Sequence, residues 1–192
     1  DGQDCLRRIR QAAVSMDELV NDFLRLSRVT RTTLAPEPVD LSAMSSEILT
    51  GLSRDEPDRT VIWSVEPGMT VTADHGLLLI AMKNLLENAW KYTGKCPKAQ
   101  IDVGMHNRSG VKTVTVRDNG AGFDPEKAHL LFIPLQRLHS SDGFPGNGIG
   151  LATVQRIIFR HGGKIWAEGT PGKGAAFSFT LPDPDARADP VS

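Results

Sequence analysis

The chain has 192 residues, of which 40% are hydrophobic and 23% are charged, and its formal net charge is −1. This composition is typical of a globular protein, and the length suits one ordinary domain with an additional segment, or two small domains. The near-neutral charge gives no support for binding to nucleic acid or to an anionic membrane surface. The two cysteines, Cys5 and Cys96, favour reduced thiols over a disulfide framework. Because no apolar run reaches membrane-spanning length and the start is no signal peptide, we expect a cytoplasmic protein without direct membrane contact.

The N-terminal segment, residues 4–33, has apolar residues at alternating steps of three and four positions, without Pro or Gly. This spacing predicts a long amphipathic helix with coiled-coil-like packing. Such a stripe is too long for a small neighbouring domain to cover, so we expect partner helices and a homodimer through residues 4–33. The alternative is a surface helix packed on its own domain. The stripe consists of Leu6, Ile9, Ala13, Met16, Val20 and Phe23.

The remaining chain alternates helices and strands. The segment "APEPVD", residues 35–40, is predicted to be a linker because its prolines break the first helix. Two short strands are expected around the turn Glu66-Pro67-Gly68, and the tail at residues 183–192 is expected to be disordered. Further helices are expected at 41–54, 75–93 and 149–162, and hairpins at 100–120 and 164–182. This order predicts an α+β fold, a two-layer sandwich with helices on one face of a mixed, mostly antiparallel sheet.

The helix at 75–93 contains "NLLENAWKYT", in which three polar residues lie along one edge of an otherwise apolar helix. Asn84, Asn88 and Lys91 are spaced i, i+4 and i+7, so they share a face. Two interpretations are open for this edge. The amides are satisfied inside a core, or they line a pocket that holds a charged ligand.

Three further stretches carry potential chemistry. In "DNGAGF" (118–123), Asp118 is expected at the end of a strand, and two glycines follow it. The stretch "LLFIPLQRLHSSDGF" (130–144) is apolar in its first half and polar in its second half. The stretch "GNGIGLA" (146–152) is a glycine-rich loop at the start of a helix. A glycine-rich loop at a helix N-terminus presents N–H groups to phosphate, and amide oxygens suit Mg²⁺. A buried Asp118 can accept a hydrogen bond from an exocyclic amine, which would select adenine, and Lys91 and Arg137 can meet phosphate charge.

Each stretch alone is unspecific. "GNGIG" lacks the Gly-Lys-Ser/Thr ending of a Walker loop and follows no strand directly, which excludes the dinucleotide fingerprint. "DNG" is more often a plain turn, and Asn84 and Asn88 alone are more often satisfied core amides. The occurrence of all four stretches in this order is what indicates a nucleotide site.

Together the four stretches resemble the N, G1, F and G2 boxes of the ATP-binding domain of bacterial sensor histidine kinases, particularly the phytochrome-type and PAS-linked kinases. This domain has the Bergerat (GHKL) fold shared with DNA gyrase and Hsp90. The resemblance extends over about residues 40–182, and residues 4–34 resemble the second helix of the dimerisation and histidine-phosphotransfer hairpin. It implies a partial hairpin at 1–34, a linker at 35–40, a catalytic domain at 41–182 and a tail at 183–192.

The resemblance also implies roles for single residues. Asn88 would hold Mg²⁺, with Asn84 assisting, and Lys91 and Arg137 would contact phosphates, Arg137 at the γ-phosphate. Asp118 would bind the adenine amine, Tyr92 would flank the adenine, and Thr180 would lie near it through water. The turn and loop residues of the implied ATP site, beneath a lid at about residues 138–147, are Gly120, Gly122, Gly146, Gly148, Ile149, Gly150 and Leu151.

The implied function is transfer of the γ-phosphoryl group of Mg-ATP to a histidine, for relay to a response regulator receiver domain. The five histidines are His75, His106, His129, His139 and His161, and none lies in the family's phosphoacceptor motif. We therefore expect the chain to begin after the helix that carries the acceptor.

Two single features need separate interpretation. His161 is expected at a helix end, where a cation is favourable. Pro134-Leu135 departs from the usual F box, in which an aromatic residue precedes Gln-Arg.

Two other functions remain open. One is a degenerate, non-catalytic ATP-binding or scaffolding relative, against which the intact Asn88, Asp118 and glycines count. The other is an anti-sigma-type serine kinase or a gyrase-like ATPase. The long N-terminal helix and the Asn at position 84, where gyrase-like relatives carry a catalytic Glu, count against both.

Overall fold

The computed structural model describes residues 33–108, 111–136 and 147–182, with residues 6, 7, 10, 16, 20, 138 and 144. The five N-terminal positions are helical, and Leu6, Met16 and Val20 expose 58–68% of their surface. Most of the expected helix at 4–33, the tail at 183–192, Arg137, His139 and Gly146 lie outside the described residues. Among the described helices, none is long and apolar enough to cross a membrane.

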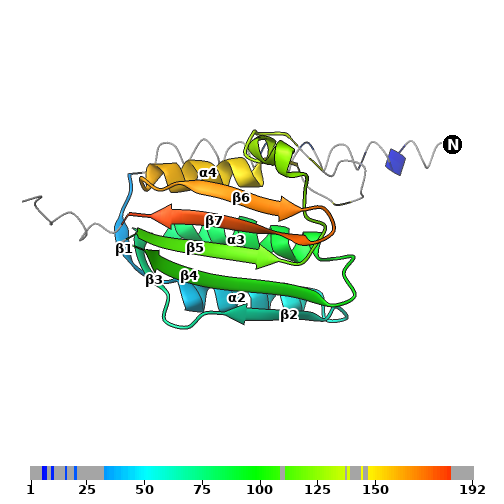
Figure 1. The fold of residues 1–192 in the computed structure, drawn as a ribbon, viewed down its shortest axis with the longest axis horizontal. Coiled ribbons are helices and arrows are strands. Elements are labelled where there is room, and N and C mark those ends of the chain that lie inside the picture. Colours follow the sequence, from blue (N-terminus) through cyan, green and yellow to red (C-terminus); the bar gives the residue numbers. More distant parts are fainter. Residues whose placement is uncertain are drawn as a thin grey trace, which may run out of the picture.

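The described residues form a two-layer α/β domain. A five-stranded sheet has the order β2-β4-β5-β7-β6, in which β2 and β4 are parallel and all other neighbours are antiparallel. Figure 1 shows α2, α3 and α4 on one side of this sheet, which confirms the predicted fold class. The elements are β1 (Pro36–Asp40), α2 (Leu41–Asp55), β2 (Val61–Val65), β3 (Thr70–Asp74), α3 (His75–Tyr92), β4 (Ala99–Arg108), β5 (Val111–Asp118), the 3-10 helix η1 (Pro125–Leu130), α4 (Gly150–Arg160), β6 (Ile165–Thr170) and β7 (Gly174–Leu181).

The segment expected as a linker at 35–40 instead contains a strand. β1 pairs with β3 in a separate two-stranded sheet, and its Val39 is buried opposite Val71. Pro36 and Pro38 have no N–H to donate, which is tolerated because β1 is an edge strand. The prolines therefore do not prevent strand pairing in this segment.

The two strands around Glu66-Pro67-Gly68 form as expected, but they do not pair with each other. β2 pairs with β4, whereas β3 pairs with β1. Glu66 explains the separation, since its N–H donates to the carbonyl of Val103 (2.9 Å) and its carboxylate accepts from the N–H of Met105 (2.8 Å). The chain therefore stays attached to β4 beyond the end of β2 and reaches β3 in a different sheet.

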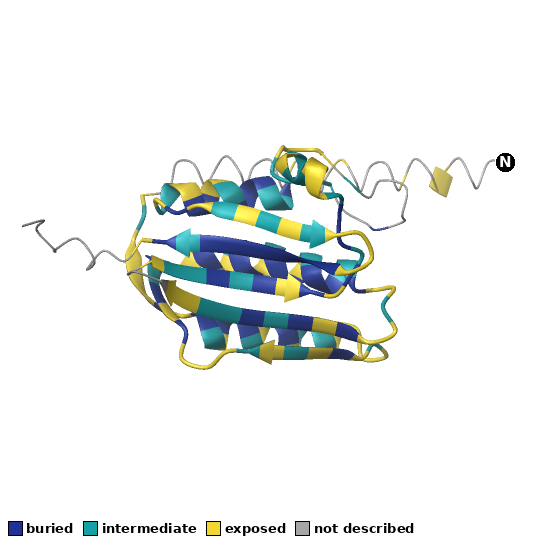
Figure 2. Ribbon diagram, in the orientation of Figure 1, coloured by how far each residue is buried: buried dark blue, intermediate teal, exposed yellow. Residues whose placement is uncertain are grey.

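The core lies between the helices and the inner face of the sheet, and β7 is buried along almost its whole length (Figure 2). In α3 the buried positions recur at helical spacing, from Leu78 through Met82 and Leu85 to Ala89. This face fixes the rotation of α3 about its axis. The edge with Asn84, Asn88 and Lys91 is consequently left half-buried at the side of the core.

Both ends of α3 are held by side chains. At the N-terminus, Asp74 accepts a hydrogen bond from the N–H of Leu77 (3.0 Å). At the C-terminus, the Arg59 guanidinium donates to the carbonyl of Trp90 and to the hydroxyl of Thr93, and it lies 4.8 Å from the centre of the Trp90 ring. These contacts satisfy groups that a helix end leaves without a partner and complement its dipole.

We expect Arg59→Ala to lower the free energy of unfolding by about 2–4 kcal/mol, since it removes charged hydrogen bonds and a cation–π contact. Urea unfolding followed by circular dichroism measures this change. The matched control is Lys83→Ala on the same helix, whose exposed pair with Glu87 spans 3.8 Å and should contribute less than about 1 kcal/mol. Equal losses for the two variants would refute this account of how α3 is held.

Candidate functional site

The polar edge of α3 is half-buried and not enclosed in the core. Asn88, Lys91 and Tyr92 are all half-buried. The Lys91 ammonium donates to the Asn88 side-chain oxygen (3.1 Å) and lies 4.4 Å from the centre of the Tyr92 ring. The amide oxygen of Asn88 thus already faces a cation, which favours the second of the two interpretations of this edge.

Asn84 joins α3 to the beginning of α4. Its amide nitrogen donates to the carbonyl of Ile80 (2.8 Å), and its oxygen occupies the space that a Cβ at position 150 would need. A side chain at position 150 would therefore have to displace the Asn84 amide from its present position. The contact brings the N-terminus of α4 beside the polar edge of α3.

The N-terminus of α4 is suited to an anion. Its N-cap residue, Ile149, is buried and provides no side-chain cap, so N–H groups of the first turn have no side-chain acceptor there. The preceding Gly148 has a φ of 73°, and its carbonyl accepts from the N–H of Leu135 (2.9 Å). Leu135 itself has a φ of 68°, which is strained for a side chain branched beyond Cβ. The unusual Pro134-Leu135 segment is thereby tied to the glycine-rich loop.

Asp118 is a buried carboxylate at the end of β5. Its side chain is on the helix-facing side of the sheet, only 6% of its surface is exposed, and it accepts from the N–H of Gly120 (2.8 Å). Burial raises the pKa of Asp118 to about 6, although the N–H groups of Gly120 and Ala175 oppose this rise. Among the described residues no cation pairs with it, so a ligand with a donor group would relieve the cost of its burial.

Two glycines after Asp118 allow the turn to pack against its neighbours. A Cβ at Gly120 would lie 2.5 Å from the carbonyl oxygen of Tyr92, and one at Gly122, whose φ is 62°, would overlap the carbonyl of Thr170. The N–H of Ala121 donates to the same Tyr92 carbonyl (3.1 Å). The turn that follows Asp118 is therefore fixed against the C-terminal end of α3, which carries Lys91 and Tyr92.

Sequence reasoning missed two contacts of Phe144, one with Tyr92 and one with Lys95. Phe144 is 8% exposed and packs edge-on against the Tyr92 ring, with 5.0 Å between the ring centres. The Lys95 ammonium lies 4.9 Å from the centre of the Phe144 ring. The signal was a single aromatic residue in a glycine-rich, polar stretch, which indicates a docking position.

The expectation for Thr180 is wrong. Its hydroxyl accepts from the N–H of Lys164 (3.0 Å) on the outer face of the sheet, and it pairs with Thr113. Because β7 is antiparallel to β5, the residue beside Asp118 comes from the beginning of β7 and is Ala175. Thr180 is five residues further along the strand, a separation of about 17 Å.

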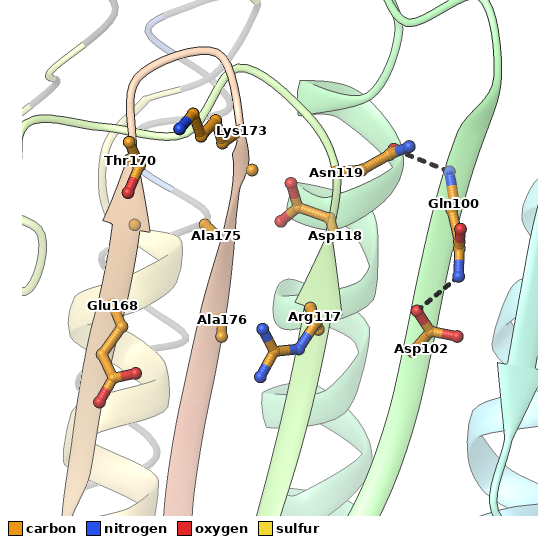
Figure 3. Close-up of a pocket in the computed structure, with 12 residues that line it drawn as sticks. Gln100, Asp102, Arg117, Asp118, Asn119, Glu168, Thr170, Lys173, Ala175 and Ala176 are labelled. Atoms are coloured by element: carbon orange, nitrogen blue, oxygen red, sulfur yellow. Dashed lines mark hydrogen bonds between the residues drawn. The ribbon is translucent and has the colours of Figure 1, made fainter.

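A separate hollow of about 420 Å³ lies on the outer face of the sheet (Figure 3). Glu168, Ala176, Arg117 and Asp102 lie next to one another across four strands and form part of its lining. The hollow reaches Asp118 at one end, but none of the polar residues of α3 lines it. The nucleotide-type site is therefore on the helix side of the sheet.

Comparison with known proteins agrees with this geometry. Residues 73–185 match the family described as histidine kinase-, DNA gyrase B- and HSP90-like ATPase. The chain is 37% identical to the methanogenesis regulatory histidine kinase FilI of Methanothrix harundinacea, over 93% of this chain and 20% of that protein. It is 36% identical to the adaptive-response sensory kinase SasA of Parasynechococcus marenigrum, over 87% of this chain and 45% of that protein. The chain thus spans less than half the length of these curated relatives.

Solved structures give the same result. The mycobacterial sensor histidine kinase MprB superposes with a TM-score of 0.64 at 28% identity, covering 77% of this chain and 97% of that one. Full-length ShkA in complex with AMPPNP superposes with a TM-score of 0.72 at 26% identity, covering 94% of this chain and 38% of that one.

Asp118→Asn is expected to change how stability depends on pH. Between pH 3.8 and about 6 the carboxyl of Asp118 is protonated in the folded chain and ionised in the unfolded chain, so this group lowers stability as the pH rises through that window. Above about pH 6 this group lowers the free energy of unfolding by about 3 kcal/mol. The variant should therefore be more stable than the wild type at pH 7.5 and lose its advantage near pH 4.

Urea unfolding of both proteins between pH 4 and pH 8 measures this difference. Asp58→Asn, at an exposed position, is the control and should follow the wild type at every pH. Parallel stability curves for the wild type and Asp118→Asn would show that the Asp118 carboxyl is not perturbed by burial.

Proposed function

Because the chain belongs to the histidine kinase-, DNA gyrase B- and HSP90-like ATPase family, as the ATP-binding domain of a sensor histidine kinase, we propose that it binds Mg-ATP and transfers the γ-phosphoryl group to a histidine on a separate helix. The phosphoryl group would then pass to a response regulator receiver domain. The observation that carries the proposal is the grouping of a buried Asp118, the polar edge of α3 and the uncapped N-terminus of α4.

Asp118 supplies base recognition in this proposal. An ionised carboxylate only accepts hydrogen bonds, so it suits the exocyclic amine of adenine and repels the carbonyl that guanine has at that position. The pKa of about 6 leaves Asp118 mostly ionised at neutral pH. Tyr92 flanks the base, with Phe144 packed on its ring.

Asn88 suits a magnesium ion carried by the nucleotide. The described residues contain no group of three or more His, Cys, Asp or Glu side chains able to hold a metal, so a protein cage is not available there. Mg²⁺ commonly takes one or two protein oxygens and completes its shell with phosphate and water oxygens. Its charge would neutralise the phosphates during transfer. Asn84 assists in this proposal, and Lys91, whose ammonium donates to Asn88, would contact a phosphate when the amide oxygen takes a metal ion.

The phosphate chain lies against the N-terminus of α4. Gly148, Ile149, Gly150 and Leu151 present backbone N–H groups there, and the helix dipole favours negative charge. Gly146 and Arg137 complete the proposed phosphate contacts, Arg137 at the γ-phosphate. Such a site works mainly by positioning and by stabilising the charge of the transferred group.

The transfer requires an acceptor from elsewhere. An imidazole nitrogen of the acceptor forms a bond to the γ-phosphorus in line with the bond to the leaving oxygen, which departs with ADP. His106 is on a strand remote from this site, and both ring nitrogens of His161 are bonded within the fold. We assign residues 1–34 to the second helix of a dimerisation hairpin, through which a homodimer forms, and we extend the catalytic domain to include β1.

Selectivity for ATP over GTP should depend on Asp118 and on pH. Asp118→Ala removes one charged hydrogen bond and should reduce the preference by about 10- to 100-fold, equivalent to about 1.5–3 kcal/mol. In the wild type the preference should weaken as the pH falls through about 6, because a protonated carboxyl can donate to guanine. Calorimetric titration with each nucleotide and Mg²⁺ measures both effects. Asp102→Ala, on the outer face, should keep the preference; equal affinity of the wild type for ATP and GTP at pH 8 contradicts the proposal.

The chain alone should hold ATP without phosphorylating itself. With γ-labelled ATP, an acid-labile and alkali-stable label should appear only after a helix carrying a family phosphoacceptor motif is added. Asn88→Ala should abolish the label by removing the metal ligand, whereas Asn107→Ala, in the exposed β4–β5 hairpin, should not. Phosphohistidine on the chain alone would mean that one of its own histidines is the acceptor.

A further inference from the structure

Asp74 connects three segments at the end of the domain opposite the nucleotide site. It is the last residue of β3 and the N-cap of α3, and one carboxylate oxygen accepts from the N–H of Leu77 (3.0 Å). The other oxygen accepts from the N–H of Ala35 (3.2 Å), where the chain enters the domain. Burial raises the pKa of Asp74, but the N–H groups of Leu77, Ala35 and Gly76 that donate to its carboxylate outweigh burial and hold the pKa below its ordinary value. The carboxylate is therefore an ionised acceptor at neutral pH.

His161 adds the end of α4 to this junction. Its Nε2 accepts a hydrogen bond from the backbone N–H of Asp74 (3.0 Å), and its Nδ1 donates to the carbonyl of Ile157 (2.8 Å). The position at the end of α4 is the expected one, but the expected cation is not compatible with this geometry, because Nε2 must keep its lone pair to accept. His161 thus holds the C-terminus of α4 against the start of α3.

β1 is the strand most dependent on this junction. It belongs to a two-stranded sheet, an arrangement that is marginal by itself, and Pro36 and Pro38 cannot donate to its ladder. Pro36 pairs with Asp74, and the preceding Ala35 is bonded to the Asp74 carboxylate. Pairing of β1 therefore depends on where Asp74 is held.

The two helices that meet at this junction also carry the nucleotide site at their other ends. α3 extends about 20 Å from Asp74 to Asn88, and α4 about 17 Å from His161 to Gly150. The helices contact each other again where Asn84 meets Gly150. Figure 1 shows β1 and β3 at the left end of the domain, which α4 also reaches. Two rigid helices fixed to each other at both ends can transmit a displacement from one end to the other.

We propose that Asp74 and His161 are positioning residues that couple the pairing of β1 with β3 to nucleotide binding at the far ends of α3 and α4. The inference rests on the proposed function. A bound nucleotide holds the N-terminus of α4 against α3, keeps His161 on Asp74 and so stabilises β1. Because coupling is reciprocal, a displacement of the segment before β1 weakens nucleotide binding by the same factor.

Amide hydrogen exchange of peptides covering residues 34–40, with and without Mg-AMPPNP, tests this coupling. In the wild type, saturating nucleotide should slow exchange at Glu37 and Val39 by at least about fivefold, the lower end of common allosteric couplings. His161→Phe keeps a ring but removes both hydrogen bonds, and it should abolish the nucleotide-dependent change. His106→Phe, at an exposed position of β4, is the matched control and should retain it.

Asp74→Asn provides a second variant that keeps an N-cap side chain for α3 but removes the acceptor for Ala35. It too should lose the nucleotide-dependent protection of β1. A purely structural role would raise β1 exchange equally with and without nucleotide, leaving the ratio unchanged, and that result overturns the inference. Calorimetry on the same samples separates the two proposals: nucleotide binding without β1 protection overturns the coupling alone, whereas no binding by the wild type overturns the proposed function as well.

Discussion

The burial of α3 against the sheet is the constraint on which the rest of this domain depends. Its apolar face, from Leu78 to Ala89, admits one rotation of the helix, and that rotation turns the edge with Asn88 and Lys91 toward the site. Asp74 and Arg59 fix the two ends of the helix. A change that loosens α3 would therefore disturb the core and the nucleotide site together.

The site keeps features that cost stability in the absence of ligand. Asp118 is buried without a cation among the described residues, and Leu135 has a left-handed backbone conformation while bonded to Gly148. Functional sites are where such costs persist, because a ligand offsets them. An adenine amine bonded to Asp118 would offset the first. The expected stabilisation by Asp118→Asn and the expected loss of base selectivity in Asp118→Ala have this one cause.

Close packing against backbone or side chains explains the glycines at Gly120, Gly122 and Gly150. At Gly120 and Gly122 a side chain would strike the carbonyls of Tyr92 and Thr170, and at Gly150 it would strike Asn84. These contacts fix the Asp118 turn to the end of α3 and the start of α4 to its middle. The glycines thus serve the packing of the site as well as any approach to phosphate.

The sequence by itself determined the helical period of α3, the two hairpins, the fold class and the grouping of its polar edge with Asp118 and the α4 loop, because these follow from local periodicity and motif order. Only the tertiary structure decided which strands pair. β1 forms in an expected linker and pairs with β3, and Thr180 lies about 17 Å from Asp118 because β7 runs antiparallel to β5. The support of α3 by Arg59 likewise depends on residues 31 positions apart. Pairing and capping of this kind are long-range contacts, whose free energy depends on the whole fold and leaves no local pattern in the sequence.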